Sequence, residues 1–398
     1  MIEGIHNFSE IGKLNKVLLH RPGKELEALT PSTIERLLFD DIPYLDVAQK
    51  EHDIFAQTLR DNGVEVVYYV DEVAKAISDP ALQIQLVNDF LNLSKINAKG
   101  LRASMTSYLL DMSPKEMVTK LIAGILRKEV ATKRATSLMD IANDDYPFVS
   151  DPMPNLYFTR DPGACVGNGI NIHRMHTPAR RRESLLLKYM YLYNPTFAAP
   201  GNKQWYDIGD NFSIEGGDVL VLSKDIVAIG LSQRTTVSGA ENFARNLLQN
   251  SDFKKVLAFD IPKTRAFMHL DTVFTMIDYD KFTIHPEIEG PLALYEMTLD
   301  HNGELCFNAL KDDLEKLLAL ELKLPAVQLL RCGGGDLMAA QREQWNDGSN
   351  TLCIRPGTVI TYERNYVTNE LLDKNGIKVL TVPSSELSRG RGGPRCMS

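Results

Sequence analysis

The sequence predicts an α/β fold in which one supersecondary unit is used more than once. Short segments rich in β-branched residues alternate with helical patterns along most of the chain. Three short motifs also recur, which is typical of a repeated unit. From about residue 73 to residue 146 the strand-like alternation stops, and a stretch rich in Leu, Ala, Lys and Met predicts helices alone. We therefore expect an α/β body formed by residues 1–72 and 149–398, interrupted by an all-helical insertion at 73–148.

Each recurring motif lies beside an expected strand. Asn62-Gly63 and Asn375-Gly376 both end a helical pattern just before an alternating strand, and glycine suits the left-handed position that closes a helix. Arg-Pro-Gly occurs at residues 21–23 and again at 355–357. Gly-Gly-Asp occurs at residues 216–218 and again at 334–336. One such echo would be chance, but three together favour a repeated α/β unit.

The other expected elements follow from local signals. Strands are expected where short β-branched runs occur, at residues 64–70, 218–222, 226–229, 256–259, 273–277 and 377–381. A helix is expected over residues 238–248. In the insertion, Asp79 and Ser113 each precede a proline, which is favoured at the first helical position, and Glu116 completes a capping box with Ser113. One apolar face of the second of these helices is expected to contain Met117, Leu121, Ile122, Ile125 and Leu126.

Composition and charge exclude several classes of protein. The 398 residues are 44% hydrophobic and 24% charged, which is ordinary for a globular protein. A net charge of −8 argues against a nucleic acid as the main partner. No run of about 18 apolar residues and no basic-then-apolar start is present, so neither a membrane span nor an export signal is expected. Five cysteines without a Cys-x-x-Cys pair predict reduced thiols and a cytoplasmic location.

Three segments carry carboxylates or a histidine in positions that suit a site. Asp161 precedes a proline, which places it at a strand end or loop, although Asp-Pro is also a common turn opening. Glu215 precedes two glycines, where backbone can approach a ligand, although a plain turn explains the pattern equally well. His269 and Asp271 are two residues apart and would share one face of an extended segment, unless the pattern is a simple surface alternation.

The C-terminal segment is rich in glycine and arginine and contains a cysteine. Arg389, Arg391 and Arg395 surround Cys396 in sequence, and nearby positive charge is expected to lower the pKa of its thiol. An Arg-Gly-Gly tract can also be an RNA-binding tail, but such tracts are usually long and repeated. This tract is short and ends in a cysteine, which favours a catalytic role.

Other motifs give no cofactor. His173 and His176 lie three residues apart, yet no Cys or Glu completes a convincing zinc set. The arginine run at residues 180–182 is most often a solvated face, although one of its members could bind a carboxylate. Neither a Gly-x-Gly-x-x-Gly turn nor a Walker-type loop is present. We therefore expect neither a nucleotide nor a metal.

A thiol, a histidine and several carboxylates in a chain without a cofactor suggest covalent catalysis by cysteine. A peptidase-like triad needs only one carboxylate to orient its histidine. The additional carboxylates among Asp161, Glu215 and Asp271 suggest that a cationic group is bound. A guanidinium is the planar group that matches paired carboxylates.

Four motifs in this order resemble the arginine deiminase family, which belongs to the guanidino-group-modifying enzymes. They are Phe-Thr-Arg-Asp-Pro at 158–162, Glu-Gly-Gly-Asp at 215–218, His-Leu-Asp-Thr at 269–272 and Gly-Gly-Pro-Arg-Cys-Met-Ser at 392–398. The resemblance spans almost the whole chain, the helical insertion included. It implies a five-bladed α/β propeller of repeated ββαβ units, and a homo-oligomer of two or more subunits is expected. It also implies hydrolysis of L-arginine to L-citrulline and ammonia, the first step of the arginine dihydrolase route.

The same resemblance assigns the catalytic roles. It implies that Cys396 is the nucleophile and forms an S-alkylthiouronium intermediate, with His269 as the general acid and base. It implies that Asp161 and Asp271 bind the guanidinium, and that Glu215 supports His269 and the substrate nitrogens. No metal and no cofactor belong to this scheme.

The resemblance also assigns substrate-binding residues. Asn155 and Phe158 would line the pocket. Arg180, Arg234 and Arg391 would bind the α-carboxylate of L-arginine, with Arg391 on a mobile final loop. Agmatine deiminase is the closest rival activity, but it needs no carboxylate-binding arginines. The sequence also leaves open an amidinotransferase and an arginine sensor without turnover.

Overall fold

The computed structural model describes residues 4–130, 146–199, 201–290 and 292–398. Four sheets in this part of the chain begin with the same pattern: two antiparallel strands, then at least one helix, then a strand parallel to the second. Their strands are β5 (Gly163–Val166), β6 (Gly169–Ile172) and β7 (Lys203–Tyr206); β8 (Val219–Val221), β9 (Ile226–Leu231) and β10 (Lys255–Asp260); β11 (Phe274–Met276), β12 (Lys281–Ile284) and β15 (Gln328–Arg331); β16 (Leu352–Arg355), β17 (Thr358–Tyr362) and β18 (Lys378–Val382). These sheets confirm the predicted α/β fold.

Two further pairings complete this body. Strands β1 (Lys16–Leu19) and β2 (Glu65–Tyr68) pair in parallel. The hairpin of β13 (Ala293–Leu299) and β14 (Leu305–Leu310) extends the sheet of β8, β9 and β10 beyond β10. The helices between strands are α1 (Lys24–Glu27), α2 (Leu45–Asp61), α8 (Arg181–Tyr193), α9 (Val237–Asn250), α10 (Pro286–Glu289), α11 (Leu314–Leu322), α12 (Leu337–Trp345) and α13 (Tyr366–Lys374).

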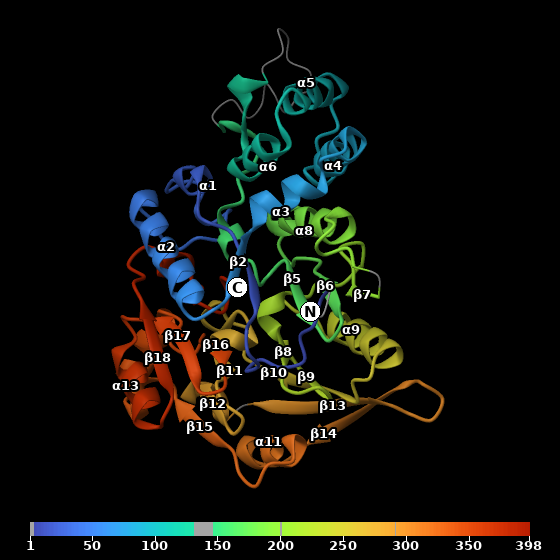
Figure 1. The fold of residues 1–398 in the computed structure, drawn as a ribbon. Helices are drawn as coiled ribbons and strands as arrows, with labels where there is room; N and C mark the ends of the chain where they lie inside the picture. The colour runs from blue at the N-terminus through green and yellow to red at the C-terminus, as the bar shows by residue number, and fades with distance from the viewer. Residues whose placement is uncertain (1–3, 131–145, 200, 291) are drawn as a thin grey trace.

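Helices follow β2 where the sequence predicts them. They are α3 (Tyr69–Ala76), α4 (Pro80–Leu93), α5 (Lys99–Leu110) and α6 (Pro114–Ala123), and α4, α5 and α6 stand together at one end of the molecule (Figure 1). Asp79 caps α4 and Ser113 forms the predicted capping box with Glu116. The part of this stretch at residues 131–145 lies outside the described residues.

The apolar helix face predicted from Met117 to Leu126 extends beyond the end of the helix in the structure. Met117, Leu121 and Ile122 are buried on α6, but the helix ends at Ala123. Gly124 then has a φ of 84°, a left-handed backbone that glycine adopts without strain. The next two residues form strand β3 (Ile125–Leu126), which pairs with β4 (Phe148–Ser150), so this stretch is not entirely helical.

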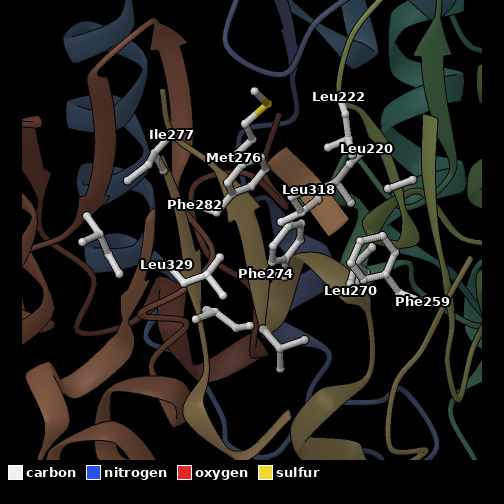
Figure 2. Packing of buried hydrophobic residues seen from close by; sticks show 14 of the residues in the cluster. Leu220, Leu222, Phe259, Leu270, Phe274, Met276, Ile277, Phe282, Leu318 and Leu329 are labelled. Carbon is white, nitrogen blue, oxygen red and sulfur yellow. The ribbon is translucent and has the colours of Figure 1, made fainter. Parts of the chain in front are cut away.

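The core beneath the site is built from aromatic and aliphatic side chains of β10, β11 and β12. Phe274 stacks on Phe282 with ring centroids 5.1 Å apart and tilts against Phe259 at 5.3 Å (Figure 2). Leu270 is fully buried in the same cluster, just before β11. This packing fixes the backbone on both sides of Leu270.

Residues 390–397 of the C-terminal segment are buried, and Figure 1 places the end of the chain near the middle of the view. Tyr362 of β17 donates a hydrogen bond to the carbonyl of Gly392 at 2.8 Å. The amide of Arg160 donates to the carbonyl of Cys396 at 3.1 Å. Among the described helices, none is both long and apolar enough to cross a membrane.

Candidate active site

A small pocket brings together most of the predicted site residues. Its lining includes Asn155, Phe158, Asp161, Arg180, Arg234, His269, Arg391 and Cys396, together with Leu38, Arg265, Met268 and Gly390. The two remaining predicted residues lie directly behind this lining. Glu215 contacts His269, and Asp271 contacts Cys396.

Asp161 is held by an arginine that leaves one of its oxygens without a partner. Arg180 Nη1 donates to Asp161 Oδ2 at 2.7 Å, and the rest of its guanidinium is engaged mainly by Glu183. Asp161 Oδ1 is buried and has no hydrogen-bond partner. An unpaired buried carboxylate oxygen is costly, so this arrangement suits the binding of a cationic donor.

Asn155 and Phe158 form one wall of the pocket. The Asn155 amide donates to the carbonyl of Leu37 at 2.6 Å, which ties the wall to the segment that carries Leu38. Phe158 lies so close to Gly392 that any side chain on Gly392 would collide with the ring. The wall and the C-terminal segment therefore fit together only because glycine stands at this position.

The predicted extended backbone between His269 and Asp271 is wrong. Only His269 is extended, and Leu270–Thr272 form a short 3-10 turn. Both side chains still reach the same site, because Leu270 between them is anchored in the core (Figure 2). A short turn around Leu270, and not strand alternation, therefore brings these two side chains together.

His269 is surrounded by carboxylates. Its Nε2 lies 2.9 Å from Glu215 Oε2, and its Nδ1 lies 3.8 Å from Asp161 Oδ1. Burial favours the neutral ring, but Asp161, Glu215 and Asp218 outweigh it and raise the pKa of His269 to about 9. A Cβ on Gly217 would lie 2.6 Å from the imidazole ring, so glycine is needed here for the close approach of backbone and histidine.

Asp218 follows Glu215 in sequence and accepts hydrogen bonds from two other segments of the site. Its Oδ2 accepts hydrogen bonds from Ser232 at 2.7 Å and Thr235 at 2.6 Å, and its Oδ1 accepts from the amide of Leu270 at 2.8 Å. Burial raises the pKa of Asp218 to about 7. The Gly-Gly-Asp motif was visible in the sequence, but nothing in it indicated that this carboxylate joins the segments bearing Arg234 and His269.

Asp271 and Cys396 share an environment organised by Arg395. Arg395 Nη1 donates to Asp271 Oδ2 at 2.7 Å, and Arg395 Nε donates to Glu10 Oε2 at 3.0 Å. Cys396 Sγ lies 3.8 Å from Asp271 Oδ2. Asp271 Oδ1 is buried and has no hydrogen-bond partner, as is true of Asp161 Oδ1.

The expectation that neighbouring arginines lower the pKa of Cys396 is wrong. Burial, followed by Asp271, Asp161 and Asp347, raises the pKa of this thiol well above its ordinary value. Two of the three arginines are already neutralised: Arg395 by Glu10 and Asp271, and Arg389 by Asp41 and Glu386. Arg395 and Arg389 are close to Cys396 in sequence, but neither places an unpaired positive charge beside its thiol.

Two further pocket arginines, Arg234 and Arg391, keep unused donors. Arg234 Nη1 lies 3.5 Å from Glu215 Oε2 and makes no hydrogen bond. The Arg391 guanidinium is stacked over the Trp345 ring at 3.6 Å from its centroid, and its Nε and Nη1 have no hydrogen-bond partner. Buried guanidinium donors of this kind suit an anionic group on a ligand.

Two histidines outside the predicted site residues support the site. His173 Nδ1 lies 2.8 Å from the carbonyl of Asp161, and the amide of His176 donates to Glu215 Oε1 at 3.0 Å. Burial lowers the pKa of His173 to about 4, so it stays neutral at ordinary pH. These contacts fix the backbone of Asp161 and the carboxylate of Glu215.

Three site residues have donor atoms close enough to hold a metal ion. Ligand atoms of Asp161, Glu215 and His269 all lie within 4.8 Å of one another. Both oxygens of Glu215 are already engaged, Oε1 by the amide of His176 and Oε2 by His269 Nε2, which leaves the group short of free ligand atoms for a metal ion. The absence of a metal stays a prediction.

The sequence is similar to known proteins over nearly its whole length. A family model described as arginine deiminase matches residues 35–398. An arginine deiminase of Bacillus cytotoxicus is 52% identical over 99% of this chain and 97% of its own length. One of Clostridium perfringens is also 52% identical, over 98% of this chain and 96% of its own length.

The chain belongs to the arginine deiminase family. A further family member, from Latilactobacillus sakei, is 52% identical over the full chain and 98% of its own length. Family membership confirms the resemblance inferred from the four motifs.

Solved structures of low sequence identity share the fold. The N-terminal domain of ArgZ, covalently bound to a reaction intermediate, has a TM-score of 0.52 at 13% identity over 96% of each chain. An amidinotransferase, SxtG, has a TM-score of 0.52 at 16% identity over 99% of this chain and 95% of its own. A dimethylarginine dimethylaminohydrolase variant has a TM-score of 0.52 at 14% identity over 96% of this chain and 98% of its own. These similarities establish the α/β fold of this member of the arginine deiminase family.

Proposed function

We propose that this chain hydrolyses L-arginine to L-citrulline and ammonia through a covalent amidino-cysteine intermediate, as the first step of the arginine dihydrolase route. One observation carries the proposal. Asp161 lines the pocket with His269 and Cys396, and Asp271 contacts Cys396. Each of the two carboxylates has one oxygen held by an arginine and the other without a hydrogen-bond partner. A planar guanidinium can donate to both free oxygens, which orients its central carbon.

The first half of the reaction begins with a protonated thiol. A bound guanidinium cation offsets the negative charge of Asp161 and Asp271, which together with burial raises the pKa of Cys396 in the free protein. As the guanidinium binds, the Cys396 thiol releases its proton to solvent, and Sγ bonds to the central carbon, giving a tetrahedral centre. His269, protonated at neutral pH, gives a proton to one nitrogen, and that nitrogen leaves as ammonia. The product of this half is an S-alkylthiouronium on Cys396.

The second half uses the same histidine in the opposite sense. Neutral His269 takes a proton from water as the water oxygen bonds to the thiouronium carbon. The carbon–sulfur bond then breaks, the proton of the new hydroxyl group passes to the departing Cys396 sulfur, and the carbon keeps the oxygen as the ureido group of citrulline. Glu215, 2.9 Å from Nε2, holds His269 in place and stabilises its charged form.

The arginines define the other end of the substrate. In this proposal Arg234 and Arg391 bind the α-carboxylate with the donors that lack partners, while Asn155 and Phe158 line the pocket. Arg180 lines the same pocket, but its contacts with Asp161 and Glu183 make the positioning of Asp161 its clearest role. Direct contact of Arg180 with the carboxylate stays a prediction.

Substrate choice tests this assignment. L-Arginine is expected to give citrulline and ammonia, and agmatine, which lacks the carboxylate, is expected to show a kcat/KM lower by about 10²-fold or more. Arg391→Ala should narrow the gap between the two substrates, and Arg342→Ala, an exposed arginine on α12, should leave it unchanged. The assay follows ureido product and ammonia. Equal turnover of both substrates would contradict the assignment, and ornithine release without ammonia would identify an amidinotransferase.

The charge of His269 gives a pH dependence. Its pKa of about 9 lies above the ordinary value of 6.5, so the proton needed for ammonia release is present at neutral pH and lost as pH rises through 9. Any stability from the charged ring follows the same sign: it is complete below pH 6.5 and disappears through pH 9. The rate of adduct formation at saturating L-arginine should therefore fall above pH 9. Rapid acid quenching across pH measures it, and a rate that stays flat well above that pH would rule out His269 as the acid.

The proposal also covers the type of propeller, the domain boundaries, the cellular location and the oligomeric state. The repeated pattern of the four sheets, with the parallel pair β1 and β2 as a fifth member, supports a five-bladed propeller of ββαβ units. We propose the body at 1–72 and 149–398 and the insertion at 73–148 as its parts. The free cysteines support a reducing, cytoplasmic location. The homo-oligomer stays a prediction, which the molar mass in solution would test.

A further inference from the structure

Asn350 lies between the nucleophile and a guanidinium-binding residue, and its amide makes three hydrogen bonds there. Asn350 Oδ1 accepts from the amide of Arg395 at 3.0 Å and from the amide of Cys396 at 3.2 Å. Asn350 Nδ2 donates to the carbonyl of Asp271 at 3.0 Å. The side chain is 1% exposed, so water does not compete for these contacts. One amide group thus joins the backbones of two site segments.

The chemistry of these partners requires an amide. Two backbone N–H groups need an acceptor, and one carbonyl needs a donor, at the same position. A carboxylate would provide the acceptor and not the donor, while an apolar residue would provide neither. The reverse orientation of the amide would set N–H against N–H, so only one orientation satisfies all three bonds.

The surroundings of Asn350 are rigid. The carbonyl of the preceding residue, Ser349, accepts hydrogen bonds from Thr275 of β11 at 2.8 Å and Thr283 of β12 at 3.0 Å. On the other side, a Cβ on Gly393 would lie 2.6 Å from Asn350 Oδ1, so the close approach of the two segments depends on glycine. Asn350 therefore links the hairpin of β11 and β12, through the carbonyl of Ser349, to the glycine-rich C-terminal segment.

We infer that Asn350 is a positioning residue for the nucleophilic step, which rests on the proposed function. It sets the backbone of Cys396 at a fixed distance from Asp271, where Sγ lies 3.8 Å from Oδ2. The Asp271 carboxylate itself is held by the Arg395 guanidinium, and the Asn350 amide contacts only the backbone of these two residues. Loss of the Asn350 amide is therefore expected to disturb attack by Sγ more than binding of the guanidinium.

Two measurements separate attack from binding. Single-turnover formation of the amidino adduct on Cys396, followed by acid quenching and mass analysis of the C-terminal peptide, reports the attack. Calorimetric titration with L-arginine in a Cys396→Ala background reports the binding. Asn350→Ala is expected to slow adduct formation by about tenfold or more while binding weakens by less than about threefold. Asn350→Asp, which keeps the acceptor oxygens, is expected to give an intermediate rate.

Asn194→Ala is the matched control. Asn194 is also a buried amide with three hydrogen bonds, but they join Glu72 and Thr196 far from the site. It should lower the melting temperature and leave the adduct rate of the folded protein unchanged. A wild-type adduct rate in folded Asn350→Ala, or a loss confined to binding, would overturn the inference. If Asn350→Ala does not fold, a wild-type rate in Asn350→Asp overturns it. Failure of the unmodified protein to form any adduct would instead refute the proposed function.

Discussion

Replacing Cys396 by Ser is expected to abolish turnover, with kcat at least about 10⁴-fold lower than in the unmodified protein. A hydroxyl is far less acidic than a thiol, and the environment of Cys396 already opposes ionisation through burial and through Asp271 and Asp161. Even with the guanidinium in place, no described neighbour would ionise a serine. Citrulline formation over hours at high protein concentration measures the residual activity.

The exposed Cys306 supplies the control for this substitution. Cys306→Ser should keep full activity because this thiol lies on strand β14, away from the pocket. His269→Gly should leave the amidino adduct on Cys396 if the first half still proceeds, because no base then activates water. Peptide mass analysis would locate it. An adduct on any other cysteine, or full activity in Cys396→Ser, would contradict the assignment.

Local signals in the sequence predicted the elements whose ends depend on their own residues. Asp79 caps α4, and Gly63 and Gly376 each adopt a φ of 81° at the end of a helix, as the Asn-Gly repeats indicated. The expected strand at 64–70 is shorter, because helix α3 begins at Tyr69, whose ring is buried. Here packing of an aromatic residue overrides an alternating pattern.

Sequence motifs were sufficient to nominate the residues of the candidate site, but not to predict the pKa of its thiol. The carboxylates, His269 and Cys396 belong to recognisable motifs, and the fold brings them together in the pocket and directly behind its lining. The raised pKa of the Cys396 thiol depends instead on burial and on Asp271, Asp161 and Asp347, which are distant from it in sequence. Arg395, its neighbour in sequence, is neutralised by Glu10 from the other end of the chain. Asn350 belongs to no catalytic motif, and only the fold places it between Cys396 and Asp271. Pairings between residues far apart in the sequence leave no local pattern to detect.

Asp161→Asn and Asp271→Asn are each expected to lower kcat/KM by about 10²-fold or more. Each change removes the charge that pairs with the substrate guanidinium and leaves a buried arginine, Arg180 or Arg395, without its full ion pair. Asp278→Asn is the control, since this carboxylate lies outside the pocket and faces Lys281 at 3.9 Å. It should keep near-normal kinetics.

In the free protein, Asp161→Asn and Asp271→Asn should differ in how much they change the reactivity of the Cys396 thiol. This difference tests the effect of each charge directly. Asp271 lies 3.8 Å from Cys396 Sγ, and its charge is, after burial, the first cause that raises the pKa of this thiol. Asp271→Asn should therefore lower that pKa and speed alkylation of Cys396 by iodoacetamide, even though turnover of L-arginine falls. A more reactive thiol in a less active protein would show that Asp271 serves the substrate and not the nucleophile. Near-normal kcat/KM in either site variant would show that its carboxylate is only structural.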